Sequence, residues 1–129
     1  MPEFQRRQKT LLCIDDYQNA LAGWCLYLQG AGYCVAGASS AQDGLEIFAT
    51  RQVDIVVLDY AMPEVTGDVV AATMKKMKPS VPIIMFTGVP DVDEQAREQI
   101  DVLVAKGCNP SVLLQIIDEV LQIRACAAS

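Results

Sequence analysis

Residues 53–63 read VDIVVLDYAMP, and this stretch limits how the rest of the chain can be arranged. Four apolar residues, Ile55 to Leu58, run without a break and stop at the carboxylate of Asp59. A short run rich in β-branched residues is typical of a strand buried on both faces of a parallel sheet. Ligands of open α/β sheets bind just outside the carboxyl ends of the strands. We therefore expect Asp59 to be the reactive residue of the protein.

The composition favours one globular domain over residues 1–129. Hydrophobic residues make up 52% of the chain and the mean hydropathy is +0.25, as in chains that bury a core. The net charge of -6 disfavours binding to a phosphate backbone, so we expect no direct nucleic-acid partner. No apolar run approaches the roughly 20 residues that span a bilayer, and residues 1–7 do not resemble a secretory signal. We expect no membrane association and a cytoplasmic location.

The sequence contains no histidine, which excludes His-based acid–base catalysis and a phosphohistidine intermediate on this chain. The five cysteines form no CxxC pair, so their spacing does not indicate a zinc site. Cys13 and Cys34 fall within apolar runs of strand character, and we expect both to be small core residues. Arg6, Arg7 and Lys9 form a small basic cluster that we interpret as solvated charge.

Apolar runs of strand length alternate five times with segments of helical period. The expected strands are Thr10–Ile14, Tyr33–Ala36, Ile55–Leu58, Val81–Phe86 and Val102–Ala105. Ser39 is expected to cap the second helix, with Gln42 completing a capping box. Pro90 and Asp91 are expected to begin the fourth helix and Asn109 to cap the last. This alternation predicts an α/β fold, doubly wound around a five-stranded parallel sheet in the order 2-1-3-4-5.

Four of the five expected strands end in side chains that can take part in chemistry. In the predicted order these four strands are neighbours, and their ends carry Asp15-Asp16, Asp59, Thr87 and Lys106. The carboxyl ends of parallel strands lie at one edge of the sheet, so we expect these side chains to converge on one site. Each residue alone is more often a turn, a cap or a solvated charge, so the functional interpretation depends on their conjunction.

Neighbouring carboxylates repel one another, and a hard divalent cation relieves that repulsion. Mg²⁺ suits such a site because it takes one or two carboxylates and keeps water and phosphate oxygens as its other ligands. The ammonium of Lys106 and the hydroxyl of Thr87 would suit a phosphoryl group on Asp59, and aspartyl phosphate is an established covalent intermediate. Its transfer requires positioning and charge neutralisation more than acid–base chemistry, in agreement with the missing histidine.

The chain resembles the receiver domains of two-component response regulators, in particular the chemotaxis-type single-domain form with its flavodoxin-like (βα)5 fold. The resemblance covers about residues 9–124 and depends on motifs in the family's order: Asp15-Asp16, Leu58 to Pro63, Gly67, Thr87-Gly88 and Lys106. By this resemblance Asp59 is phosphorylated by a histidine kinase or a histidine phosphotransfer protein. It also implies that Asp16, Asp59 and the backbone carbonyl of Ala61 bind Mg²⁺ directly, that Asp15 acts through water, and that Thr87 and Lys106 hold the phosphoryl oxygens.

The resemblance further implies that phosphorylation shifts the domain between two conformations. The change would repack the face formed by the fourth helix, the fifth strand and the fifth helix, and so control a protein partner. We expect no enzyme activity beyond Mg²⁺-dependent self-phosphorylation and slow self-dephosphorylation. Because the chain ends soon after the fifth helix, we also expect no output domain.

Four positions depart from the family pattern. Gly107 follows the lysine where proline is usual, and a cis bond before a non-proline costs about 2.5–4 kcal/mol, so we expect a trans peptide or an altered loop. Leu103 replaces the family's switch aromatic. Ala61 and Val89 occupy positions that border the attacking water, and neither side chain can hydrogen-bond it. We therefore expect self-dephosphorylation without help from these two side chains.

Two other functions stay open at this stage. Leu103 and Gly107 would suit a phosphorylation-independent interaction module with a receiver fold. An enzyme on this topology is disfavoured, because a flavin protein needs a Ser/Thr/Gly-rich phosphate loop after its first strand and none is present. A phosphatase with a nucleophilic aspartate on the first strand would need a second aspartate where this chain has Tyr17.

Overall fold

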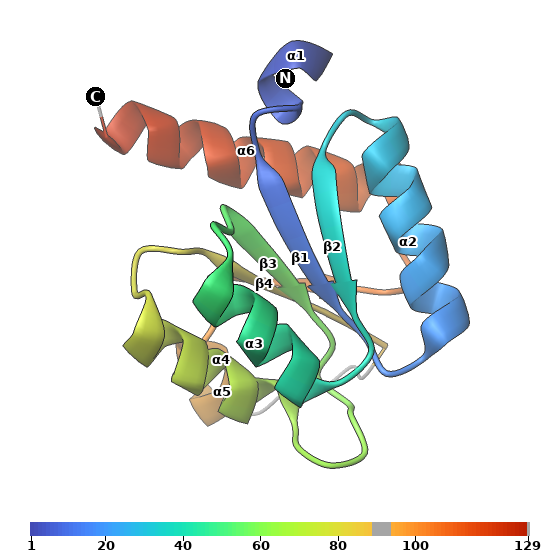
Figure 1. Cartoon of the computed structure of the whole chain (residues 1–129), viewed down its shortest axis with the longest axis vertical. Helices are drawn as coiled ribbons and strands as arrows, with labels where there is room; N and C mark the ends of the chain where they lie inside the picture. The colour runs from blue at the N-terminus through green and yellow to red at the C-terminus, as the bar shows by residue number, and fades with distance from the viewer. Residues whose placement is uncertain (89–93, 129) are drawn as a thin grey trace.

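Five parallel strands form one sheet in the computed structural model, which describes residues 1–88 and 94–128, with side chains as far as residue 123. In sheet order the strands are β2 (Cys34–Ala38), β1 (Thr10–Ile14), β3 (Ile55–Leu58), β4 (Ile83–Thr87) and β5 (Val102–Ala105). The order β2-β1-β3-β4-β5 confirms the predicted doubly wound α/β fold (Figure 1).

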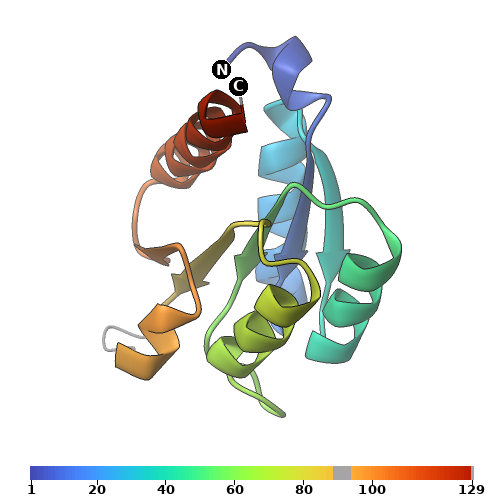
Figure 2. The same ribbon diagram turned by 90° about the vertical axis from the view of Figure 1, so that its left-hand side faces the viewer.

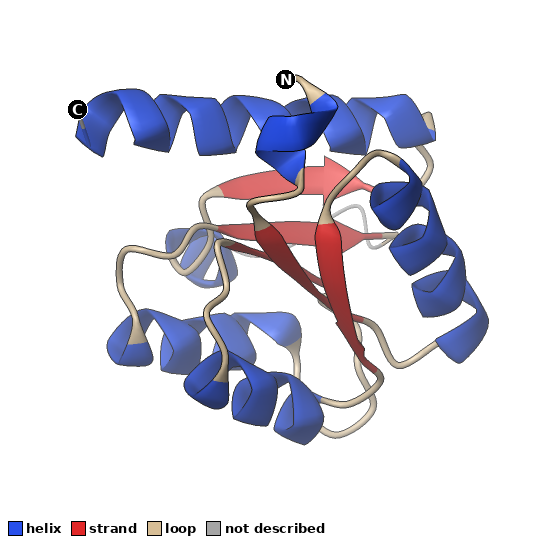
Figure 3. Cartoon of the chain, turned by 45° about the horizontal axis from the view of Figure 1, so that its top comes forward, coloured by secondary structure: helices blue, strands red, loops and turns tan. Residues whose placement is uncertain are grey.

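The helices of the described residues are α1 (Glu3–Arg6), α2 (Gln18–Gly30), α3 (Ala41–Thr50), α4 (Gly67–Met77), α5 (Glu94–Glu98) and α6 (Pro110–Ala128). Figure 3 shows α2 and α6 on one face of the sheet and α3 and α4 on the other. Among these helices, none has the length and apolar character that a membrane span requires.

The side chains of each strand alternate between the two faces and divide the core into two layers. Ile55 and Val57 of β3 pack in the layer beneath α2 and α6, whereas Val56 and Leu58 pack in the layer beneath α3 and α4. All four are buried, which confirms the interpretation of this run as a central strand. The burial of both faces holds the end of β3, and therefore Asp59, at a fixed place in the sheet.

Several element boundaries differ from the prediction by one or two residues. Ser40 rather than Ser39 caps α3, because the N–H of Asp43 donates to Ser40 Oγ at 3.1 Å. β2 extends to Ala38 because its ladder with β1 continues to the end of that strand. Pro90 and Asp91 lie outside the described residues, and the described part of their predicted helix is α5.

The segment before β1 is held against the core by a set of contacts that we call the N-terminal clamp. Arg6 forms two hydrogen bonds with Asp118 of α6, at 2.7 and 3.2 Å, and a third with the carbonyl of Ala31 at 3.1 Å. The hydroxyl of Tyr33 also donates to Asp118. Figure 2 shows α1 at the end of the sheet opposite the strands' carboxyl ends. The interpretation of Arg6 as solvated charge is therefore wrong.

The two cysteines expected in the core differ in their surroundings. Cys13 of β1 is buried, as expected. Cys34 is exposed, because it begins β2, which forms an edge of the sheet, and the expectation that it is a core residue is wrong.

Candidate functional site

Three carboxylates lie close together at the carboxyl edge of the sheet. Asp15 and Asp16 follow β1, and Asp59 follows β3, its hydrogen-bonded neighbour. One ligand atom from each carboxylate lies within 4.8 Å of the other two. Asp15 and Asp59 are each only 6% exposed, whereas Asp16 faces solvent. The set combines two buried carboxylates with an exposed one, and such an oxygen-rich group suits a hard divalent cation.

The ammonium group of Lys106 contacts both buried carboxylates. Its Nζ lies 2.6 Å from Oδ2 of Asp15 and 3.4 Å from Oδ2 of Asp59. Burial acts to lower the pKa of Lys106, but the hydrogen bond to Asp15 and the charge of Asp59 outweigh it, so the pKa is raised. Lys106 is therefore a cation at neutral pH, and its closer partner is Asp15.

Burial is the main reason that the pKa of Asp59 is raised, and the charge of Asp15 raises it further. Lys106 and a backbone hydrogen bond with Ala61 act in the opposite direction and only partly compensate. Ionised Asp59 is thus less stable here than a carboxylate in water. A cation beside it would remove this penalty, so the electrostatics as well as the donor set fit a divalent ion.

Backbone hydrogen bonds between neighbouring strands fix where these side chains start. The N–H of Asp59 donates to the carbonyl of Ile14 at 3.0 Å, and the N–H of Lys106 donates to the carbonyl of Thr87 at 2.9 Å. Each bond continues a strand ladder one residue beyond the strand. The rigid sheet, rather than a loop, therefore sets the spacing of Asp59 and Lys106.

Gly67 allows the loop after β3 to return closely past Asp59. Its N–H donates to the carbonyl of Tyr60 at 2.8 Å. A Cβ at residue 67 would lie 2.4 Å from the carbonyl oxygen of Asp59 and 2.9 Å from Cα of Tyr60. These are backbone atoms that no rotamer change can move, so only glycine fits this approach.

The other predicted residues occupy the places that the strand order gives them. Thr87 is the last residue of β4 and is buried, and Ala61 lies in an exposed part of the loop after Asp59. Val89 lies outside the described residues. No described peptide bond is cis, so the bond before Gly107 is trans, as expected for a non-proline residue.

Leu103 packs in a small apolar group next to the site. In the ladder between β4 and β5 it lies opposite Met85. The group, which we call the Leu103 cluster, consists of Leu103, Met85, Ala96, Ile100 and Tyr60. Because Tyr60 directly follows Asp59, the cluster begins one residue from the candidate reactive carboxylate.

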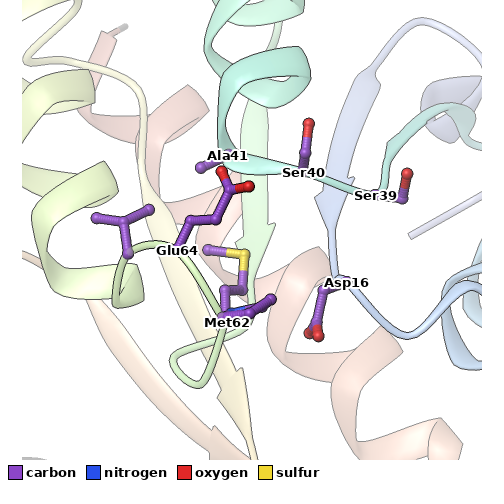
Figure 4. Close-up of a pocket in the computed structure, with 8 residues that line it drawn as sticks. Asp16, Ser39, Ser40, Ala41, Met62 and Glu64 are labelled. Atoms are coloured by element: carbon purple, nitrogen blue, oxygen red, sulfur yellow. The ribbon is translucent and has the colours of Figure 1, made fainter.

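A pocket of about 100 Å³ opens beside Asp16 (Figure 4). It lies between the segment that leads into α3 and the loop after β3, and its lining residues are Asp16, Ser39, Ser40, Ala41, Met62, Pro63, Glu64 and Val65. The pocket gives solvent-sized molecules room next to the exposed carboxylate of the site. No local sequence pattern predicts this pocket, because three separate segments of the chain form its wall.

Two backbone N–H groups that donate to the carboxylates of the site were also not predicted from the sequence. The N–H of Tyr17 donates to Oδ1 of Asp15 at 3.0 Å. The backbone of Ala61 also forms a hydrogen bond with the Asp59 carboxylate, and this bond leaves its carbonyl, the predicted metal ligand, uninvolved. Tyr17 is the N-cap of α2, and N–H groups at the start of a helix lack partners within the helix. This rule could have predicted that the N–H of Tyr17 donates to a nearby carboxylate.

The sequence model of the family described as response regulator receiver domain matches residues 11–118. The chain belongs to this family. The receiver domain is 31% identical over 115 residues to the transcriptional regulatory protein GlrR of Escherichia coli. The aligned part covers 87% of this chain and 26% of GlrR, so the chain spans about a quarter of that relative's length.

Solved structures share the fold of this receiver domain. A CheY-like response regulator receiver domain protein from Methanospirillum hungatei has a TM-score of 0.86 and 25% identity, and the match covers 92% of this chain and 98% of that one. The response regulator protein TrrA from Thermotoga maritima, solved in complex with Mg²⁺-BeF, has a TM-score of 0.82 and 28% identity, with 86% and 97% covered. These neighbours support the flavodoxin-like fold and the predicted family.

Proposed function

We propose that Asp59 is the phosphoacceptor of a two-component phosphorelay and that a histidine kinase or a histidine phosphotransfer protein supplies the phosphoryl group. The observation that carries the proposal is the buried Asp59 carboxylate beside both Asp15 and Lys106. In the reaction an oxygen of Asp59 attacks the phosphorus of a phosphohistidine, the P–N bond breaks and the imidazole leaves. Residues 1–129 contain no histidine, so the phosphohistidine donor has to lie outside them.

We infer that Mg²⁺ binds beside Asp59. Asp16, Asp59 and the backbone carbonyl of Ala61 would hold it directly, and Asp15 would act through water. The inference is supported by the three carboxylates within 4.8 Å and by the relative TrrA, which was solved with Mg²⁺-BeF. The ion would supply positive charge that neutralises the carboxylates and the phosphoryl oxygens.

Lys106 and Thr87 would hold the phosphoryl oxygens. Nζ of Lys106 already lies 3.4 Å from an oxygen of Asp59, although its shorter contact is to Asp15. We propose that Lys106 exchanges the Asp15 contact for a phosphoryl oxygen, because a dianionic acceptor attracts an ammonium more strongly than a single carboxylate. The hydroxyl of Thr87, at the end of the neighbouring β4, would supply a second donor.

Phosphorylation would shift a two-state equilibrium and control a protein partner through the face formed by α5, β5 and α6. The Leu103 cluster supports this route, because it joins Tyr60, the residue after Asp59, to residues of β5 and α5. With an aliphatic residue at position 103, the change would be a repacking of Leu103 against Met85 rather than the rotation of an aromatic ring. Activity beyond self-phosphorylation and slow self-dephosphorylation is not expected, and the cytoplasmic location stays a prediction.

A phosphorylation-independent interaction module is the second candidate, and the packed aliphatic Leu103 favours it. In that case partner binding would be the same for wild type and for a chain that cannot be phosphorylated. The receiver fold would then serve only to present the face of α5, β5 and α6.

Incubation with Mg²⁺ and acetyl phosphate separates these functions. By intact mass, wild type and the control Asp43→Ala, which alters an exposed aspartate of α3, should gain one phosphoryl group, whereas Asp59→Ala should gain none. Beryllofluoride with Mg²⁺ should change the amide NMR signals of β4 and β5 in wild type and in Asp43→Ala, but not in Asp59→Ala. If wild type gains no phosphoryl group while it is folded, the phosphoacceptor proposal is wrong.

A further inference from the structure

Two thiols meet where α2 crosses the end of β1. In the ladder of β1 and β2, Cys13 lies opposite Gly37, so both residues present the same face to α2. Sγ of Cys25, on α2, lies 3.0 Å from the position that a Cβ at residue 37 would occupy. Neighbouring strands are about 4.8 Å apart. The Cys25 sulfur therefore fills the space left by the missing side chain of Gly37, directly beside Cys13.

The two thiols differ in access to solvent and in acidity. Cys13 is 3% exposed, whereas Cys25 is half-buried and reaches the surface of α2. A hydrogen bond with Cys13 lowers the pKa of Cys25 to about 7, although burial acts in the opposite direction. Oxidants react with exposed thiolates rather than with buried thiols. Cys25 thus has the properties of the attacking thiol and Cys13 those of its resolving partner.

We propose that Cys25 and Cys13 form a redox-sensitive pair, in which a peroxide oxidises Cys25 and Cys13 then closes a disulfide between α2 and β1. The proposal concerns a modification separate from phosphoryl transfer and does not depend on the proposed function of Asp59.

The chemistry balances with hydrogen peroxide as the oxidant. The Cys25 thiolate attacks one peroxide oxygen, the O–O bond breaks, and the leaving hydroxide takes up a proton to form water. The Cys13 sulfur then attacks the sulfenic sulfur of Cys25, the S–O bond breaks, and the hydroxide leaves with the proton of Cys13 as a second water. Two thiols and one peroxide give one disulfide and two waters, and a dithiol reductant reverses the bond.

The disulfide would close a ring around the segment that carries the acidic residues of the site. Asp15 and Asp16 lie between Cys13 and Cys25 in the chain. Both ends of that segment would then be tied together by a covalent bond. A cytosolic disulfide is usually transient or regulatory, which suits a bond formed only on exposure to peroxide.

Peroxide treatment of the full wild-type chain under non-reducing conditions provides the test. Trypsin cannot separate Cys13, Cys25 and Cys34, because no lysine or arginine lies between Lys9 and Arg51. A protease that cleaves after aromatic residues is therefore needed. Cleavage after Tyr17 separates Cys13 from Cys25, and cleavage after Tyr33 releases Cys34. The monomer should lose the mass of two hydrogens and give one linked pair of peptides, containing Cys13 and Cys25, that dithiothreitol separates.

Matched variants distinguish the attacking thiol from the resolving thiol. Cys13→Ser should accumulate a dimedone-reactive sulfenic acid at Cys25 and form no internal disulfide. Cys25→Ser should remain a monomer without an internal disulfide and should gain no oxygen at Cys13 at the same peroxide dose. Cys34→Ser, which changes an exposed cysteine outside the pair, should form the disulfide at the wild-type rate. Wild-type peptides that show only oxyacids, links between molecules, or a different cysteine pair would overturn the proposal, whatever the variants do.

Discussion

Replacing Gly67 with alanine tests whether the loop after β3 is as tightly packed as the structure indicates. The added methyl would lie 2.4 Å from the Asp59 carbonyl oxygen and 2.9 Å from Cα of Tyr60. Overpacking costs about 1–3 kcal/mol, and we expect the upper end because backbone atoms have to move. Alanine gains about 0.5–1 kcal/mol over glycine in a helix, which opposes the clash at the start of α4. The net expectation is a loss of about 2 kcal/mol in the free energy of unfolding.

Urea unfolding followed by far-UV circular dichroism measures this loss. Gly23→Ala is the matched control, because Gly23 lies within α2 and nothing lies within 4 Å of its Cβ position. The control should gain about 0.5–1 kcal/mol, so the two substitutions should change stability in opposite directions. If Gly67→Ala is as stable as wild type, the loop can move away from the methyl without cost and the steric argument for glycine fails.

The same substitution should disturb the site, because the atom that the methyl displaces belongs to Asp59 itself. We expect Gly67→Ala to accept phosphoryl groups from acetyl phosphate at least several-fold more slowly than wild type. The comparison is made without urea, at a temperature where both proteins are folded. Wild-type labelling rates in a clearly destabilised Gly67→Ala protein would show that the loop strain does not reach the Asp59 side chain.

Three further predictions address the charges and the clamp. Burial and Asp15 raise the pKa of Asp59, so the native state holds the Asp59 proton more tightly than the unfolded state does. In metal-free buffer, the free energy of unfolding of wild type should therefore fall relative to that of Asp59→Asn as the pH rises from 3.8 through the higher native pKa. Parallel stability curves for the two proteins would contradict this expectation. Ala61→Asn adds a side chain that can orient water, so the half-life of the phosphorylated protein should change, and an unchanged half-life would count against an attacking water at this position. Asp118→Ala leaves Arg6 and Tyr33 without their shared acceptor and should lower the free energy of unfolding in urea by about 2–3 kcal/mol. This loss is smaller than the roughly 3–5 kcal/mol of a fully buried pair because Arg6 is partly exposed. A loss smaller than that of Tyr33→Phe, about 1 kcal/mol, would show that the clamp is weak.

The central part of the fold follows from sequence patterns because its signals are local and repeated. The strands Thr10–Ile14, Ile55–Leu58 and Val102–Ala105 have the predicted bounds, since each is an apolar run flanked by polar residues. The convergence of Asp15, Asp59 and Lys106 then follows from strand order, because parallel strands end at the same edge.

What the sequence did not provide depends on contacts between distant segments. Arg6 looks like a solvated charge until α6 brings Asp118, 112 residues away, to within 2.7 Å. Cys34 lies in an apolar run, and the predicted sheet order already places its strand at the edge, but the exposure of the Cys34 side chain there is seen only in the structure. The prediction of Ser39 as helix cap was wrong because the adjacent Ser40 satisfies a similar pattern, with Asp43 three residues on in place of Gln42.

The N-terminal clamp has a consequence for how motion can spread through the domain. Asp118 lies near the middle of α6, and Arg6 connects it to the segment that leads directly into β1, the strand before Asp15. Sliding or rotation of α6 would therefore have to break these contacts or pull on the strand that positions the acidic residues. We therefore expect α6 to be the less mobile side of the face that it shares with α5 and β5. Hydrogen exchange should accordingly be slower around Asp118 than in the rest of α6, and any rearrangement should concentrate in the short α5, which the clamp does not hold.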